Sequence, residues 1–147
     1  MKRFALALVL CSGGLQAAAT PVVVCATAQG VAVAIPNSVQ FFDRNGRVIW
    51  NTDGVAIPTA AFASADRIAV VDSINNDVHI ADLANGRGKT IRVGETPIEG
   101  IFVGRDFFLL ERDARTLERI SPDGTRSLLA LTSDPAVLRQ SNGRLYV

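Results

Sequence analysis

The stretch RIAVVDSINNDVHIADL, Arg67–Leu83, places two apolar runs on either side of a polar turn. The runs RIAVV and VHIAD are short and rich in β-branched residues, which is typical of strands. The turn between them, Asp72–Asp77, contains two aspartates and two asparagines, which favour tight turns. Because an isolated hairpin is marginally stable in water, this hairpin is expected to belong to a larger sheet.

The same pattern recurs along the chain with a period of 37 to 39 residues. Apolar runs follow four prolines, Pro21, Pro58, Pro97 and Pro135, and a second apolar run begins in each unit at Gly30, Arg67, Asp106 and Gly143. Third runs begin at Val39, Val78 and Leu117, and each is followed by a turn dipeptide, Asn45-Gly46, Asn85-Gly86 or Asp123-Gly124, and then by a fourth run. Each repeat therefore predicts a four-stranded antiparallel meander.

This organisation predicts an all-β fold, a β-propeller-like array of four-stranded antiparallel blades. Runs of four to six residues between closely spaced turn signals do not fit helical periodicity. Because every residue of RIAVV after Arg67 is apolar, this strand is expected to be covered on both faces. The alternation in VHIAD instead predicts an outer strand, with His79 and Ala81 on an outward face.

One blade also carries a family motif. The segment PTAAFASADRIAVVDSINNDVHIADLANG, Pro58–Gly86, resembles an NHL-type propeller repeat: a proline, a short strand, a turn, the RIAVVDS strand, an Asn-Asn turn and the VHIAD strand. The first and third repeats lack the DSINNDVHIAD pattern. Related propellers with similar repeats, the YVTN and lactonase-like groups, remain open as alternatives.

The N-terminus has the layout of a secretory signal peptide. Lys2 and Arg3 precede an apolar core, and Ala17–Ala19 form a small-residue cleavage site, so we expect residues 1–19 to be removed before Thr20. The remaining residues, 20–147, form one partial propeller domain with repeats at about 21–57, 58–96, 97–134 and 135–147. This signal peptide predicts that the protein is secreted or periplasmic. No run is long enough to span a membrane as a helix.

The repeats amount to about three and a half blades, whereas closed propellers usually have four to eight. Three explanations follow: a truncated product of a longer propeller, which we favour, a homo-oligomer that pairs exposed blade edges, or an open arc. The fourth repeat stops inside the apolar strand GRLYV, which predicts a long unpaired hydrophobic edge.

The composition limits the kinds of site and partner that this chain can have. Cys25 is the only cysteine after the signal peptide, and its place in PVVVC favours burial. Nearly balanced charge, with no basic cluster in the sequence, argues against a nucleic-acid partner. Trp50 and Tyr146 are expected to pack between blades. His79 is the only histidine, so a histidine-rich metal site or a histidine relay within one chain is excluded.

The expected ligand-binding residues lie in the loops of one rim, because the turns after the second strands and the linkers between blades face the same side of a propeller. The candidates are Asp72, Asn75, Asn76, Asp77, Glu95, Glu111, Arg112, Asp113 and Asp134. Their oxygens could hold a hard cation such as Ca²⁺, but the favoured interpretation is that Asp and Asn cap their own turns. No cofactor and no catalytic residue is therefore predicted.

The function we expect is binding or scaffolding, with loops on one rim engaging a protein or a small ligand. A non-enzymatic role is favoured, because a channel site needs residues that converge from a closed ring of blades. The alternative is a metal-dependent lyase or lactone hydrolase, the activity that resemblance to NHL-like and lactonase-like propellers implies.

Overall fold

The computed structural model describes residues 20–142 and 144–147. The signal-peptide prediction falls on residues 1–19 and so lies outside the described residues. The described chain is built from β-strands, with no helix, and its strands run in sequence order within each sheet. This all-β arrangement is the fold class that the repeat pattern predicts.

Three four-stranded antiparallel sheets and one two-stranded sheet correspond to the predicted repeats. Blade 1 comprises β1 (Val23–Ala26), β2 (Gly30–Ile35), β3 (Ser38–Asp43) and β4 (Val48–Asp53). Blade 2 comprises β5 (Ala60–Ala63), β6 (Arg67–Asp72), β7 (Asp77–Asp82) and β8 (Gly88–Arg92). Blade 3 comprises β9 (Pro97–Val103), β10 (Asp106–Glu111), β11 (Thr116–Ile120) and β12 (Arg126–Ala130), and the half-blade comprises β13 (Arg139–Ser141) and β14 (Arg144–Tyr146).

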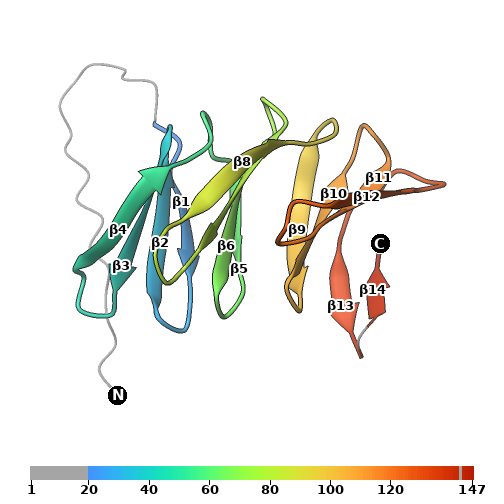
Figure 1. Cartoon of the computed structure of the whole chain (residues 1–147). Helices are drawn as coiled ribbons and strands as arrows, with labels where there is room; N and C mark the ends of the chain where they lie inside the picture. Colours follow the sequence, from blue (N-terminus) through green and yellow to red (C-terminus); the bar gives the residue numbers. More distant parts are fainter. Residues whose placement is uncertain (1–19, 143) are drawn as a thin grey trace.

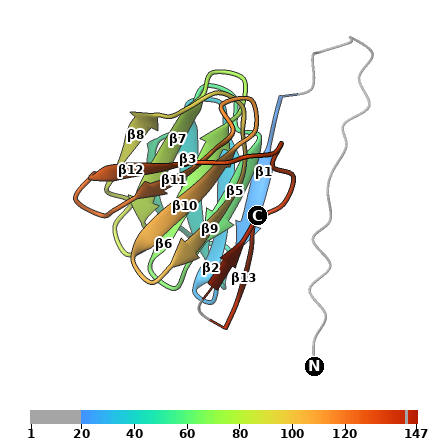
Figure 2. The same ribbon diagram turned by 90° about the vertical axis from the view of Figure 1, so that its right-hand side faces the viewer.

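The sheets lie side by side in an open arc, from blade 1 at the left of Figure 1 to the half-blade at the right. Viewed from the half-blade, the sheets stack one behind another (Figure 2). The first strands of neighbouring blades contact each other, β1 against β5 and β5 against β9, so they form the inner edge of the arc. The strands β4, β8 and β12 are the opposite edges of their sheets.

Blade 2 is the best-buried part of the chain because it has a full blade on each side. All six residues of β6 are buried, which confirms the prediction for RIAVV. One face of blade 2, with Ile68 and Val70, packs against Phe41 and Val39 of blade 1. The other face packs against blade 3, in a second apolar cluster that contains Ala69, Val71, Val78, Ile80, Phe107 and Leu109. Two apolar cores therefore join blade 2 to its neighbours, blades 1 and 3.

The outward face predicted for β7 is wrong. His79 is 3% exposed and Ala81 is 1% exposed, as buried as their neighbours Val78 and Ile80. His79 is paired across the sheet with Val70 and Thr90, so it shares the face of blade 2 that packs against blade 1. The alternation in VHIAD reflects two inter-blade faces, neither of which is solvent. Burial lowers the pKa of His79, and the Asp53 carboxylate opposes this shift.

The turns after the second strands repeat closely in the three blades. Asn37, Asn76 and Arg115 occupy equivalent places and have φ angles of 62°, 58° and 52°. Asparagine tolerates this left-handed conformation, which is costlier for arginine. Each of these residues also bonds through its backbone to the linker that follows its blade, at Val55, Val93 and Leu131. The three turns are thus tied to the start of the next blade.

Trp50 packs between blades, as predicted. Its ring stacks on Phe41 with 5.4 Å between ring centroids, and its indole N–H donates a hydrogen bond to Leu83 O of blade 2 at 2.8 Å. Gly86 leaves room for the indole, because a Cβ atom there would lie 2.7 Å from the ring. The same prediction is wrong for Tyr146, which is 52% exposed.

Two other expectations need correction. Cys25 is half-buried, because β1 is a four-residue inner-edge strand with alternating exposure, and burial raises the pKa of its thiol. The long apolar edge expected in the fourth repeat is a three-residue strand, β14, whose Leu145 packs against the cluster that contains Leu138. Both strands are too short to bury a continuous apolar run.

Candidate functional site

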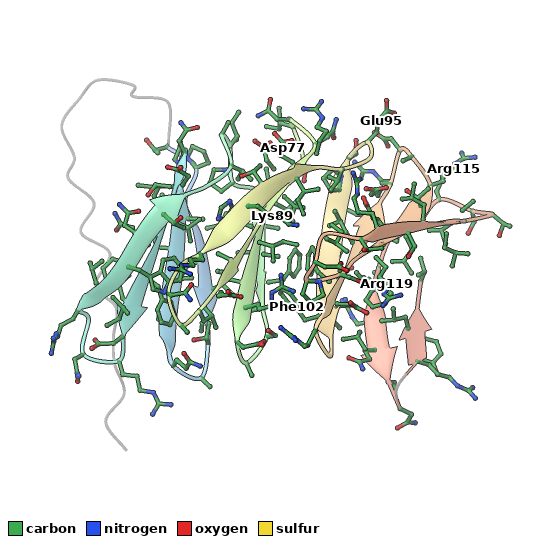
Figure 3. All side chains as sticks on the ribbon, viewed as in Figure 1. Asp77, Lys89, Glu95, Phe102, Arg115 and Arg119 are labelled. Carbon is green, nitrogen blue, oxygen red and sulfur yellow. The ribbon has the colours of Figure 1, made fainter. Side chains whose placement is uncertain are left out.

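The candidate residues lie along one edge of the arc, which we call the turn rim. It consists of the turns β2–β3, β6–β7 and β10–β11 and the linkers β4–β5, β8–β9 and β12–β13, at the top of Figure 1. Figure 3 shows Asp77, Glu95 and Arg115 at this rim, on blades 2 and 3. The prediction that these turns and linkers face the same side therefore agrees with the structure.

Asp72 is fully buried at the end of β6, so its carboxylate is not on the exposed surface of the turn rim. Its carboxylate accepts hydrogen bonds from the amide N–H of Ile57 in the preceding linker (2.8 Å) and from those of Ile74 (3.0 Å) and Asn75 (2.8 Å). Burial alone would raise the pKa of Asp72, but these bonds and one from the Asn75 side chain lower it below its ordinary value. Asp72 thus caps its own turn and also fastens blade 2 to the linker from blade 1.

Glu111 occupies the place in blade 3 that Asp72 occupies in blade 2, and it likewise fastens its blade to the preceding linker. It is 1% exposed, and its Oε1 accepts a hydrogen bond from the N–H of Gly94, in the preceding linker, at 2.6 Å. Its other oxygen accepts a hydrogen bond from the Thr116 hydroxyl. Burial raises the pKa of Glu111, and the neighbouring carboxyl of Glu118 raises it further. This site therefore brings two buried carboxyl groups, those of Glu111 and Glu118, close together.

Glu118 is a buried site residue that the sequence analysis missed. It is fully buried on β11 and pairs with Arg126 of β12, while its Oε2 has no hydrogen-bond partner among the described residues. The alternation Leu117, Glu118, Arg119 in a strand expected to be peripheral does not reveal this burial. The pairing with Arg126 also raises the pKa of that guanidinium.

The Glu111–Glu118 pair predicts a pH-dependent stability. Because the folded-state pKa of Glu111 is raised, its contribution is present below the ordinary carboxyl pKa and is lost as pH rises through the folded-state value. A glutamine at position 111 can still accept from Gly94 and can donate an N–H to the carboxyl groups nearby. Between pH 4 and pH 8, we expect the free energy of unfolding of Glu111→Gln to rise by about 1–3 kcal/mol relative to that of wild type.

Urea unfolding of Glu111→Gln and wild type at each pH measures this difference. Asp113→Asn, which alters an exposed acid nearby, is the control and should show no such trend. A difference between Glu111→Gln and wild type that does not change with pH would contradict the raised pKa.

The two asparagines of the β6–β7 turn are also structural. The Asn75 side-chain N–H donates a hydrogen bond to Asp72 at 2.7 Å. The Asn76 side-chain oxygen accepts from the N–H of Thr96, in the linker to blade 3, at 2.9 Å. These bonds fix the turn both internally and to the next blade, in line with the expectation that Asp and Asn cap turns here.

The remaining candidates expose their charges at the turn rim. Glu95, Arg112, Asp113 and Asp134 are exposed, and Asp77 is half-buried. Asp134 pairs with Arg115 at 2.7 Å, while Arg112 and Asp113 are 3.6 Å apart, and Asp77 and Arg92 are 3.7 Å apart. Exposed pairs of this kind are weak, so they can exchange an internal partner for a ligand at low cost.

A groove along the inner edge of the arc is a further feature that the sequence analysis missed. It has a volume of about 340 Å³ and is lined by β1, β5 and β9, including Cys25, Ala61 and Phe102. The small residues at Ala26, Ala63 and Gly100 keep it open, and their recurrence on first strands is the signal that could have indicated it. In a propeller this edge faces the central axis.

Side chains that could bind a metal ion are spread apart in the part of the chain that the structure describes. Within it, no group of three or more His, Cys, Asp or Glu residues could hold a metal ion. His79 donates to or accepts from Thr90 at 3.0 Å and lies between blades 1 and 2, away from the turn-rim acids. No described helix is long and apolar enough to cross a membrane.

Three four-stranded antiparallel sheets side by side, joined along their first strands and followed by half of a fourth, define a partial β-propeller. The propeller-like architecture predicted by the repeats is therefore confirmed.

Comparisons with solved structures give the same fold. The chain is similar to a catalytically inactive histidine-to-alanine variant of virginiamycin B lyase from Staphylococcus aureus with quinupristin, with a TM-score of 0.63 and 15% identity over 78% of this chain and 42% of that one. It is similar to BamB from Moraxella catarrhalis, with a TM-score of 0.66 and 16% identity over 84% of this chain and 38% of that one.

A third similar structure is BBS1N in complex with ARL6DN, with a TM-score of 0.61 and 11% identity over 79% of this chain and 42% of that one. The chain thus spans about two fifths of the length of these structures. No protein-family model and no curated protein matches it. At this identity the likeness concerns the fold.

Proposed function

We propose that this chain is an exported β-propeller-type binding or scaffold protein that engages a protein or a small ligand through the loops of the turn rim. One observation carries the proposal: exposed charged side chains stand on a rim whose backbone is held between blades. Side-chain oxygens of Asp72, Asn76 and Glu111 accept hydrogen bonds there from backbone N–H groups of the inter-blade linkers. Loops that are already ordered lose little entropy on binding. The rim therefore combines accessible charge with a fixed shape.

The comparisons support binding as the general class. BBS1N was crystallised in complex with ARL6DN, and virginiamycin B lyase was crystallised with quinupristin. Propellers with this architecture thus bind either a protein or a small molecule. Because one fold carries many functions, the identity of the ligand has to come from this chain's own rim.

The proposal includes export. Residues 1–19 carry the positive, apolar and small-residue segments of a signal peptide. N-terminal sequencing of the protein from the extracellular or periplasmic fraction should give Thr20 as the first residue. Recovery of the uncleaved chain in the cytoplasmic fraction alone would contradict export.

Charge swapping tests the rim directly. The double variant Arg112→Asp with Asp113→Arg keeps the net charge but reverses an ion pair at the turn rim. The double variant Arg47→Asp with Asp66→Arg also keeps the net charge and alters exposed residues of the opposite edge. Immobilised mature protein is incubated with extract of the host's extracellular fraction, and retained molecules are quantified by mass spectrometry.

With the rim variant, we expect the retained amount of one partner to fall at least about tenfold. Misplaced charges across an interface cost several kcal/mol of binding free energy. The variant on the opposite edge should retain it. Equal loss in both variants, or no loss in the rim variant, would count against the turn rim as the binding surface.

The alternative, a metal-dependent lyase or lactone hydrolase, rests on the resemblance to virginiamycin B lyase and related propellers. The binding proposal requires no divalent ion, including Ca²⁺. Metal analysis of the protein as isolated separates the two functions. A stoichiometric divalent ion would favour the enzyme.

Self-association is part of the proposal. Large apolar side chains are about half exposed or more at both ends of the three-blade array: Val22 and Val24 in or beside β1, and Leu128 and Leu129 on β12. Exposed apolar edges of this kind favour pairing with another chain. Sedimentation velocity of the mature protein should show a species larger than the monomer. A monodisperse monomer at micromolar concentration would contradict this part of the proposal.

A further inference from the structure

A second pocket lies on the edge of the arc opposite the turn rim, between blades 2 and 3. It has a volume of about 320 Å³ and is bordered by the start of β6, the end of β7, the β7–β8 turn, the β9–β10 turn and Pro122. Four of its lining residues are cations, Arg67, Arg87, Lys89 and Arg105, and one is a carboxylate, Asp82. We call this site the basic pocket.

Arg67 is the fixed element of the basic pocket. Only 8% of it is exposed, and its Nη1 donates a hydrogen bond to Arg105 O, across the blade boundary, at 2.9 Å. Its guanidinium lies 5.9 Å from the ring centroid of Phe102, a cation–π distance. Arg67 Nε and the Asp82 carboxylate are 3.9 Å apart, a loose ion pair. Because a guanidinium has five N–H donors, most of its donor capacity is left for another group.

The other three cations of the basic pocket have long side chains and are exposed. Arg87 and Lys89 come from blade 2, and Arg105 comes from blade 3. Lys89 reaches toward the β11–β12 turn, where its Nζ lies 2.3 Å from the place that a Cβ atom on Gly124 would occupy. Figure 3 labels Lys89 and Phe102 in this region. Arg119, also labelled, is neutralised by Asp106 at 2.7 Å and does not line the pocket.

The charges do not balance. Four cations border a volume of about 320 Å³ with a single lining carboxylate, and Asp123 stands at the margin beside Lys89. Like charges that line one pocket repel one another, and a bound anion would relieve the repulsion. Arginine forks match the terminal oxygens of phosphate and sulfate groups, and lysine adds a point charge.

We propose that the basic pocket binds a small polyanion that carries a phosphate or sulfate group, independently of the turn rim. Arg67 and Arg105 would hold the anion at the blade boundary, while Arg87 and Lys89 would close over it. Because the anion would bridge blades 2 and 3, its binding would also stabilise the folded arc.

Pyrophosphate and sulfate are the probes, titrated into the full mature protein by calorimetry at constant ionic strength. Lys89→Gln and Arg87→Gln are chosen because both residues are exposed. Arg47→Gln, an exposed arginine on blade 1, removes the same charge far from the pocket and is the matched control. Circular dichroism confirms that each variant is folded.

We expect saturable binding with one site. Each pocket variant should raise the Kd for pyrophosphate by about tenfold or more, the loss of one charge-assisted contact, while Arg47→Gln should leave it within about twofold. Backbone amide shifts on titration should centre on Gly88 and Arg105. The relative affinities of pyrophosphate and sulfate then distinguish a phosphate site from a sulfate site.

Three results would overturn the proposal: no saturable binding of either probe up to millimolar concentration, equal weakening by Arg47→Gln, or amide shifts confined to the turn rim. The charge-swap test of the turn rim alters residues outside the basic pocket and measures a different ligand, so the failure of one proposal is distinguishable from the failure of the other.

Discussion

Replacing Trp50 with alanine should lower the free energy of unfolding by about 3–5 kcal/mol. Trp50 joins blades 1 and 2 through its stacking on Phe41, its contact with Gly86 and its hydrogen bond to Leu83 O. The alanine variant would leave a large cavity between the blades and a carbonyl without its donor. This loss is comparable to the whole stability of many small domains.

Urea unfolding followed by far-UV circular dichroism measures the effect, since the chain has no second tryptophan for fluorescence. Trp50→Phe keeps the aromatic packing but removes the N–H donor, and should lie between wild type and alanine. Val48→Ala, in the same strand but 56% exposed, is the control and should change stability by less than about 1 kcal/mol. A small effect of Trp50→Ala would mean that blades 1 and 2 are not packed as described.

Removing the Asp72 carboxylate should be the second large effect. Asp72→Ala leaves the N–H groups of Ile57, Ile74 and Asn75 without their acceptor in a buried place, which costs about 2–4 kcal/mol. Asp77→Ala, five residues away, removes an acid whose side chain is 26% exposed and lies 3.7 Å from Arg92, so it should cost less than about 1 kcal/mol.

The acid limb of the stability curve gives a second measurement of Asp72. Because its folded-state pKa is lowered, its contribution is present above the ordinary carboxyl pKa and is lost as pH falls through the folded-state value. Asp72→Asn should therefore flatten the loss of stability on acidification. If Asp72→Ala and Asp77→Ala cost the same, the turn would not depend on the buried carboxylate.

The repeat period predicted the blades because each turn has a local chemical requirement. Asn76 and Asn37 tolerate the left-handed conformation, and glycine provides it at Gly46, Gly86 and Gly124. These signals are visible in sequence because a turn is made by residues next to one another. The apolar run of β6 was similarly informative, since only a strand covered on both faces can be apolar throughout.

The errors arose where burial depends on a neighbouring blade. His79 and Ala81 alternate with Val78 and Ile80 as they would in a strand with one solvent face, but blades 1 and 3 cover both faces of β7. Glu118 is also buried, although the sequence of its strand is typical of a strand at the periphery of a blade. A single sequence does not state which blade lies against which face.

The candidate sites show the same limit. The acids of the turn rim could be placed together because their turns recur at a fixed period. The sequence does not indicate which of them are buried, because the linker from the preceding blade covers Asp72 and Glu111. Asp113 and Asp134 remain exposed. The basic pocket is invisible as a sequence cluster, because Arg67, Lys89 and Arg105 are far apart along the chain and converge only when blades 2 and 3 pack.

The central claim is that the blades are stacked in order, with blade 2 covered on both sides. Amide hydrogen exchange of the mature protein, followed by NMR, tests it most directly, because protection reports the stability of each strand. We predict the slowest exchange in β6 and β7, faster exchange in blade 1, and the fastest exchange in β12 and the half-blade, where most residues are exposed. Slowest exchange in β12 or the half-blade, or unprotected amides in β6, would contradict the stacked-blade arrangement.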